Sequence, residues 1–190
     1  PELVPGADPA IETSVSAAPK ESVLLVCPRQ GRGAPPFPAE CARAAAALGA
    51  KRGWKLRYIA MNVRQDLPLC RALVSETGGE AAAAPEDTAA LTRLFASARL
   101  TVSMRLHALT LSYLAGTPAF GIDGDGRIAA FAKECGIPYR TVEECGDIAA
   151  ALEEALTAET PDAAIWNDRL AAGRAALARV LGAPEKEKEI

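Results

Sequence analysis

The chain has 190 residues and a formal net charge of −3; 49% of its residues are hydrophobic, 24% are charged and 5% are aromatic. This length and composition suit one globular domain of ordinary size with a substantial core. The slightly acidic balance excludes a broad electrostatic attraction for nucleic acid or acidic membranes, so any anion site must be local. No apolar run reaches the roughly 20 residues needed to cross a bilayer.

The cysteines predict neither a disulfide framework nor a metal site. They are odd in number, and no two form a C-x-x-C pair. Reduced thiols in a cytoplasmic protein are the simplest interpretation. No basic stretch followed by a short apolar one predicts a signal peptide at the start. The chain begins at Pro1 rather than Met, so we expect a fragment of a longer protein. The five positions are Cys27, Cys41, Cys70, Cys135 and Cys145.

The first half of the chain alternates between predicted strands and helices. Residues 1–21 are rich in Pro, Ala, Ser and Thr and are expected to form a lead-in or linker. The apolar run 22–27 predicts a strand buried on both faces, followed by a Gly- and Arg-containing loop over 28–33. A helix over 38–52, a strand over 55–61 and a helix over 67–77 follow, the two helices ended by Gly53 and Gly78.

The second half repeats this alternation. We expect a helix from Pro85 to about Ala98, a strand over 100–103, and a helix from about Arg105 that ends before Gly116. A strand over 118–122, a Gly-Asp loop over 121–126, a helix ending near Gly136 and a short strand over 139–142 come next. Helices over 147–158 and 163–181 close the domain, and 183–190 form a solvated charged tail.

Strands that alternate with helices predict an α/β fold, because such units pair in parallel. We therefore expect a Rossmann-like parallel sheet flanked by helices over residues 22–182. Ligands of such sheets bind beyond the carboxyl ends of the strands. That rule selects three loops, at residues 28–33, 104–107 and 121–126.

The loop at 104–107 carries the strongest chemical signal. A buried strand ends at Ser103 and a helix begins almost at once, and the free N–H groups of a first helical turn favour phosphate or carboxylate. Arg105 and the single histidine, His107, lie at this positive pole, where a bound anion would offset their charge. The alternative is structural: His107 bonds within the core and Arg105 pairs with a nearby carboxylate.

The other two loops add weaker candidates. Arg29 follows the first strand in a glycine-containing loop, and its alternative is an exposed loop charge. Asp123 and Asp125 either bind a sugar hydroxyl or shape a glycine turn, and the turn is the favoured interpretation.

Several of these motifs together resemble polysaccharide pyruvyl transferases that modify cell-wall polymers. The motifs are Ser-Met-Arg-Leu-His-Ala-Leu at 103–109, Gly-Thr-Pro at 116–118, Phe-Ala at 131–132 and Gly-Ile-Pro at 136–138. Ala-Asp-Pro-Ala at 7–10 adds a weaker match, so the resemblance covers roughly residues 7–138.

The resemblance implies one half of a GT-B-like architecture of two Rossmann-like domains. This chain would be the C-terminal domain, which binds phosphoenolpyruvate, and a separate N-terminal domain would complete the enzyme. The activity implied is transfer of pyruvate as a ketal to a sugar of a cell-surface polysaccharide. It needs no cofactor or metal, since phosphoenolpyruvate is a substrate, and no nucleic acid.

The implied site follows from the same match. Arg105 and His107 would be catalytic, and the acceptor would be a sugar or lipid-linked saccharide, which would bring the protein to the membrane periphery. One departure concerns the family's Tyr-Asp-Pro-Lys segment, which reads Ile-Asp-Gly-Asp-Gly-Arg here at 122–127; Arg127 stands in for the missing lysine charge. The expected substrate-binding residues are Arg29, Ser103, Arg105, Leu106, His107, Asp123 and Arg127.

Two other functions stay open at this level. The domain could be a GT-B glycosyltransferase donor domain that binds a nucleotide sugar through its diphosphate, although no confident glutamate for the ribose is visible. It could also be a non-catalytic domain of the same fold, which the missing tyrosine and lysine favour slightly.

Overall fold

The computed structural model describes residues 18–31 and 33–158. The chain divides into two units, and all described residues belong to the one that spans Val15–Pro161. The expected helix over 163–181, the charged tail at 183–190 and most of the lead-in at 1–21 lie outside the described residues. The proposed domain bounds of 22–182 therefore stay a prediction.

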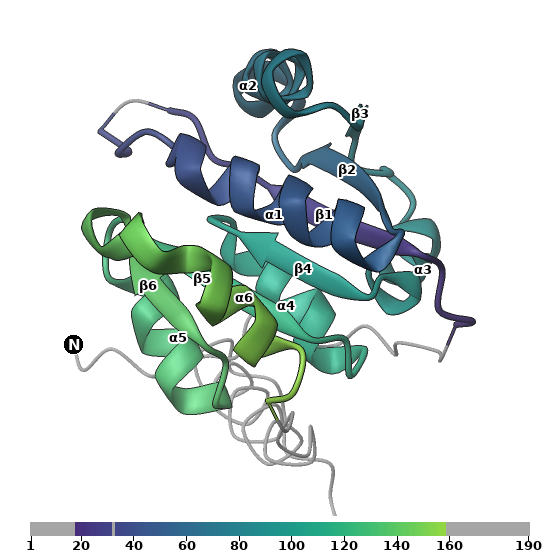
Figure 1. The fold of residues 1–190 in the computed structure, drawn as a ribbon. Helices are drawn as coiled ribbons and strands as arrows, with labels where there is room; N and C mark the ends of the chain where they lie inside the picture. The colour runs from purple at the N-terminus through teal and green to yellow at the C-terminus, as the bar shows by residue number, and fades with distance from the viewer. Residues whose placement is uncertain (1–17, 32, 159–190) are drawn as a thin grey trace, which may run out of the picture. The chain divides into compact units, whose positions relative to one another are not determined.

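The described residues form a parallel six-stranded sheet with the order β3-β2-β1-β4-β5-β6 (Figure 1). Every neighbouring pair is parallel, and Val26 in β1 is in register with Tyr58 in β2 and Val102 in β4. This confirms the predicted Rossmann-like α/β arrangement. The strands are β1 (Val23–Cys27), β2 (Lys55–Ala60), β3 (Glu80–Ala83), β4 (Leu100–Ser103), β5 (Ala119–Asp123) and β6 (Tyr139–Thr141).

Helices cover both faces of the sheet. One face carries α1 (Ala39–Arg52), α2 (Val63–Thr77) and α6 (Ile148–Ala155), which follows a 3-10 helix, η2 (Val142–Asp147). The other carries α3 (Thr88–Ser97), α4 (Leu106–Leu114) and α5 (Arg127–Cys135). No helix within 18–31 or 33–158 combines the length and apolarity of a membrane span.

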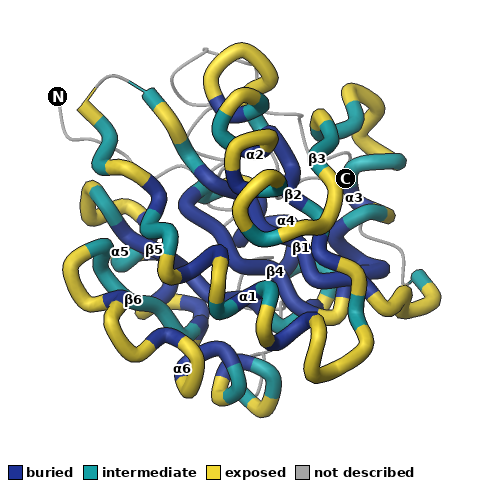
Figure 2. Tube along the Cα trace, turned by 45° about the horizontal axis from the view of Figure 1, so that its top comes forward, coloured by how far each residue is buried: buried dark blue, intermediate teal, exposed yellow. Residues whose placement is uncertain are grey.

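The central strands are buried on both faces, as their continuous apolar sequences predict. In β1, Leu24 and Val26 belong to the core beneath α1 and α6, while Leu25 and Cys27 belong to the core that includes Phe95 of α3. Figure 2 shows this buried centre, with exposed segments around its rim. The sheet is thus a rigid platform from which the loops project.

The structure differs from the sequence-based expectation at α2, at β3 and at the 3-10 helix η2, which was not predicted. The predicted α2 starts at residue 67, but the helix begins at Val63, because the side chain of Asn62 accepts the Gln65 N–H (3.2 Å) and caps the first turn. Pro68 lies inside this helix. Because proline is favoured in the first turn of a helix, it led to a predicted start at residue 67. Strand β3 was missed, because its Glu-Ala-Ala-Ala sequence lacks the β-branched residues that mark strands.

The strand order places three loop-bearing strands side by side. From β1 the chain moves outward through β2 to β3, then crosses back to β4 on the other side of β1. Loops that follow β1 and β4 therefore diverge, and such a switch point is where open α/β sheets bind ligands. The three loops selected from sequence follow β1, β4 and β5, which are neighbours.

Candidate functional site

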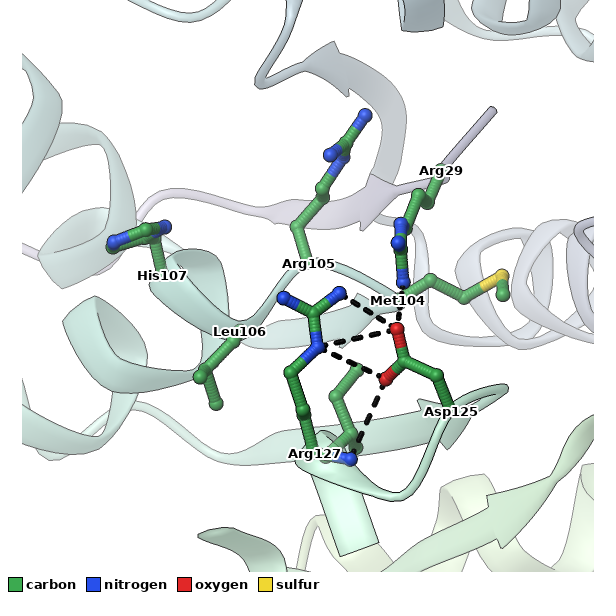
Figure 3. A pocket seen from close by; sticks show the side chains of 8 residues that line it. Arg29, Met104, Arg105, Leu106, His107, Asp125 and Arg127 are labelled. Carbon is green, nitrogen blue, oxygen red and sulfur yellow. Dashed lines mark hydrogen bonds and ion pairs between the residues drawn. The ribbon is translucent and has the colours of Figure 1, made fainter. Parts of the chain in front are cut away.

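A pocket of about 180 Å³ lies at this carboxyl edge of the sheet. Figure 3 shows the side chains that line it, which come from the loops after β1, β4 and β5. They are Arg29, Met104, Arg105, Leu106, His107, Asp125, Arg127 and Ile128.

Ser103 shapes the start of α4 and does not line the pocket. It is fully buried at the end of β4, where its Oγ accepts the Arg105 N–H (2.8 Å) and donates to the Arg105 carbonyl (2.9 Å). These bonds hold Arg105 in the extended conformation of an N-cap residue, one position before the helix. Ser103 therefore fixes the backbone of Arg105 at the start of α4.

The Arg105 side chain is paired with a protein carboxylate. Its Nε donates to Asp66 Oδ2 (3.0 Å), and its Nη2 donates to Asp66 Oδ1. The cation at this helix pole suggested a bound anion from sequence alone, but Asp66 supplies the compensating charge. Of the two interpretations, the structure bears out pairing with a carboxylate. Arg105 nevertheless lines the pocket.

Asp66 was not among the residues predicted from sequence. It lies in the first turn of α2 and its side chain is fully buried. The signal was present: an aspartate four residues after Asn62, at the end of a predicted strand, is at the sheet edge where ligands bind. The late start predicted for α2 placed it in a loop instead.

Arg29 and Arg127 share a single carboxylate. Arg29 Nη1 donates to Asp125 Oδ2 (2.5 Å), and Arg127 donates to the same group through Nε (3.1 Å) and Nη2 (2.6 Å) (Figure 3). The hydrogen bonds from Arg127 and then Arg29 hold the pKa of Asp125 well below its usual value, and Asp125 raises the pKa of Arg127. The side chains of Arg29 and Asp125 remain 21% and 32% exposed.

Asp123 serves the turn, which was the favoured interpretation. Its carboxylate accepts the N–H groups of Gly126 (2.9 Å), Ile128 (3.0 Å) and Ala129 (3.2 Å), and it is 6% exposed. The orphan amides at the start of α5 are therefore satisfied by the protein. Asp123 lies beneath the loop and outside the pocket lining.

The β1 and β5 loops touch through Gly124. A Cβ built there would lie 2.5 Å from Cγ of Pro35 and 3.3 Å from Cε of Met104. Glycine lets the proline-rich loop after β1 lie directly on the Gly-Asp loop after β5. This contact accompanies the ion pair between Arg29 and Asp125.

The two ion pairs cross the switch point in opposite directions. Arg29 comes from the β1 side and pairs with Asp125 from the β5 side, whereas Arg105 comes from β4 and pairs with Asp66 from α2. Each half of the sheet thus supplies one arginine and one aspartate. Among the side chains that line the pocket, three guanidinium groups accompany one carboxylate, Asp125. The carboxylates of Asp66 and Asp123 lie close by, outside the lining.

His107 and Leu106 form the first turn of α4. Both line the pocket, and His107 is exposed. In Figure 3 the imidazole lies beyond Leu106, on the side of Arg105 away from Asp125. Imidazole is the side chain that most often transfers protons in enzyme active sites. The sequence-predicted residues Arg29, Arg105, Leu106, His107 and Arg127 are therefore brought together.

A second, wider hollow of about 550 Å³ lies at β6. Its polar groups are largely committed to local structure: Glu144 Oε2 accepts the Thr141 N–H (3.2 Å) within a capping box, and Arg140 Nη1 donates to the Tyr139 carbonyl (2.9 Å). It lacks the convergence of loops from several strands. The pocket at the switch point is the stronger candidate.

Residues 18–31 and 33–158 contain neither a cluster suited to a metal ion nor an exposed cysteine. No cluster of three His, Cys, Asp or Glu side chains suited to a metal occurs there. All five cysteines are buried, and none is in a disulfide bond. Burial raises the pKa of the Cys27 and Cys41 thiols, and that of Cys70 to about 12, which keeps them protonated.

The fold and the pocket define a Rossmann-like α/β domain with a small cationic pocket at its topological switch point. The family model for polysaccharide pyruvyl transferase matches residues 6–126. The match covers most of the chain, including Arg29, Asp66, Arg105 and His107, and the chain belongs to this family. No curated protein matches the sequence. Membership supports a role in pyruvyl transfer on polysaccharides.

Proposed function

We propose that this chain carries the donor site of a polysaccharide pyruvyl transferase and that the donor is phosphoenolpyruvate. The observation that carries the proposal is the pocket where Arg29, Arg105 and His107, all inside the family-matched segment, meet at the sheet's switch point. The acceptor is a sugar of a cell-surface polysaccharide, free or lipid-linked, and the product is a pyruvate ketal.

The size and charge of the pocket support a small anion. Pockets for drug-sized ligands measure about 300–1,000 Å³, whereas this pocket measures about 180 Å³. Guanidinium forks match both carboxylate and phosphate groups. A compact molecule that carries both groups fits this inventory better than a nucleotide sugar does.

Three side chains take chemical roles in this proposal. Arg105 and Arg29 bind the carboxylate and phosphate, and His107 gives a proton to the methylene carbon of phosphoenolpyruvate. The central carbon then forms a bond to one sugar hydroxyl. A second hydroxyl of the same sugar adds there as the carbon–phosphate oxygen bond breaks. Of the two hydroxyl protons, one leaves with inorganic phosphate and the other restores the imidazole.

The acceptor side belongs to a second domain in this proposal. In a GT-B-like pair of Rossmann-like domains, the carboxyl edge described here would be the C-terminal wall of the cleft, and an N-terminal domain would bring the sugar. Phosphoenolpyruvate is a cytoplasmic metabolite, so the reaction takes place in the cytoplasm. A lipid-linked acceptor would hold the enzyme at the membrane periphery.

One observation favours the second candidate function, a non-catalytic domain that has the fold of the family and does not carry out the reaction. Arg29, Arg105 and Arg127 are all bound to protein carboxylates, so the pocket already balances most of its charge. A ligand must compete with these contacts. A non-catalytic domain would leave them undisturbed, and ligand binding therefore separates the two functions.

The test compares phosphoenolpyruvate, inorganic phosphate and a nucleotide sugar by calorimetry and thermal shift. We expect phosphoenolpyruvate to bind and to raise the melting temperature, because a ligand at 100 times its Kd stabilises by about 2.7 kcal/mol. Arg105→Lys keeps a charge for Asp66 but loses the fork. It should weaken binding by about 2 kcal/mol or more, which is roughly thirtyfold.

Arg43→Lys is the matched control, since Arg43 is an exposed arginine of α1 that pairs with Glu76 away from the pocket. It should bind like the wild type. Binding of the nucleotide sugar alone would identify a glycosyltransferase donor domain, and binding of neither would favour the non-catalytic domain.

A further inference from the structure

Asp66 is a fully buried carboxylate at the edge of the candidate site. It lies in the first turn of α2, where the chain leaves β2, and it does not line the pocket. Buried carboxylates occur almost only where they are paired and hydrogen-bonded. The groups that hold Asp66 therefore indicate why it is there.

Both oxygens of Asp66 are used twice. Oδ1 accepts the backbone N–H of Gln30 (3.1 Å) and the Nη2 of Arg105; Oδ2 accepts the backbone N–H of Asn62 (2.8 Å) and the Nε of Arg105 (3.0 Å). Gln30 belongs to the loop after β1, Asn62 follows β2 and Arg105 follows β4. One carboxylate thus joins the loops of three neighbouring strands.

The geometry of this ion pair fixes the guanidinium plane. Bonds from Nε and Nη2 to two oxygens of one carboxylate leave the Arg105 side chain a single orientation. Within the described residues, the side-chain hydrogen bonds of Arg105 come from Nε and Nη2, and none comes from Nη1. Because Arg105 lines the pocket, we take Nη1 as the nitrogen that would meet a ligand.

We propose that Asp66 is the positioning residue of the donor site: it orients Arg105 so that Nη1 binds the donor anion. The donor part of this statement rests on the proposed function, whereas the orientation of Arg105 does not. Only a carboxylate fits the position, because all four of its contacts are N–H donors. The amide of Asn would place its own N–H groups against two of them.

The first measurement is the Arg105 Nε–H signal in nitrogen-15 NMR, assigned with Arg105→Lys. In the wild type this proton should exchange slowly with solvent, because it is bonded to a buried carboxylate. In Asp66→Asn it should exchange faster or broaden. A proton that is equally protected in both proteins would overturn the proposal, whether or not any donor binds.

The second measurement is phosphoenolpyruvate affinity by calorimetry. Asp66→Asn should weaken binding by roughly 10- to 100-fold, the range found when outer-shell partners of metal-site ligands are removed. Asp66→Glu keeps the charge but moves it by one methylene, so its affinity should fall between those of the wild type and Asp66→Asn. Wild-type affinity in the Glu variant would contradict the positioning role and stays informative if the Asn variant does not fold.

The matched control is Thr117→Val, at the opposite edge of the sheet. Thr117 is 1% exposed, and its Oγ1 donates to the Phe95 carbonyl (2.9 Å) and accepts from Lys20 (2.6 Å). The variant should lose stability yet keep donor affinity and a protected Arg105 Nε–H. If Thr117→Val lost as much donor affinity as Asp66→Asn, the effect of Asp66 would be one of general stability and not of positioning. Absence of donor binding in the wild type would refute the proposed function and leave the NMR test to decide on Asp66.

Discussion

Asp125 pairs with both Arg29 and Arg127, so an anion that binds to these arginines would compete with it. Its carboxylate accepts hydrogen bonds from both guanidinium groups, and it is partly exposed. Under the proposed function, donor binding to Arg29 would exchange one anion for another. At the residue level, Asp125 would then favour ligands of high negative charge.

We predict that Asp125→Asn increases the affinity for phosphoenolpyruvate several-fold. The change removes the competing negative charge and leaves the lining with three guanidinium groups and no carboxylate. Calorimetry at low and high salt measures the effect, which should shrink as salt screens the added charge. An affinity that falls would show that Asp125 holds Arg29 in its binding position.

The pH dependence of this cluster follows from the direction of the pKa shift. Asp125 has a lowered pKa in the folded state, so the ion pairs stabilise the fold fully above the pKa of an unfolded aspartate, about 3.9. That stabilisation is lost as the pH falls toward the folded value. The stability difference between wild type and Asp125→Asn, from urea unfolding, should be constant at neutral pH and shrink under acid conditions. A difference that grows on acidification would contradict the shift.

At the level of elements, periodicity and buried apolar runs predicted most of the strands and helices. Strands β1, β2, β4 and β5 could be predicted, because strands buried on both faces have continuous apolar sequences such as 22–27. Strand β3 could not be predicted, since alanine has no preference for strands and the extended conformation here depends on pairing with β2. The start of α2 depended on the Asn62 cap, and with the cap unrecognised the place of Asp66 in the first helical turn could not be predicted.

The residues of the candidate site could be predicted in part, and their pairing could not. The rule on carboxyl strand ends brought Arg29, Arg105 and His107 to one edge, where the structure places them, and the family resemblance added Arg127, which lines the same pocket. Ser103 and Asp123, which were also expected, lie outside the lining. Which carboxylate faces which arginine depends on residues 39 and 96 positions away. A single sequence contains no signal for contacts of that separation.

The contact between the β1 and β5 loops leads to a prediction for Gly124. Gly124→Ala would force its methyl group into Pro35, because a Cβ at this position would lie only 2.5 Å from the proline Cγ. Overpacking of this kind typically costs about 1–3 kcal/mol, so we expect a loss of that size in urea unfolding. Gly146→Ala is the control, since a Cβ there has no neighbour within 4 Å. Equal effects would show that the two loops do not press on each other.

For the whole molecule, burial of every cysteine predicts how the thiols react. The five cysteines are buried and outside disulfide bonds, and burial raises the pKa of Cys70 to about 12. We expect a thiol reagent at neutral pH to react slowly with the native protein and to label five thiols per chain after denaturation. Rapid labelling of the native protein would reveal local opening of the core. Cys135→Ser serves as a reference that lowers the denatured count by one.

The reciprocal ion pairs have a consequence for how the molecule reaches its native state. Each pair joins the β1–β3 half to the β4–β6 half, so neither half can assemble the pocket before the connection through α3 has closed. Contacts between distant residues form late, because closing a long stretch of chain reduces its entropy first. During refolding, the ability to bind the proposed donor should therefore appear after the secondary structure. Two fragments separated between β3 and α3 should recover this binding only when they are mixed.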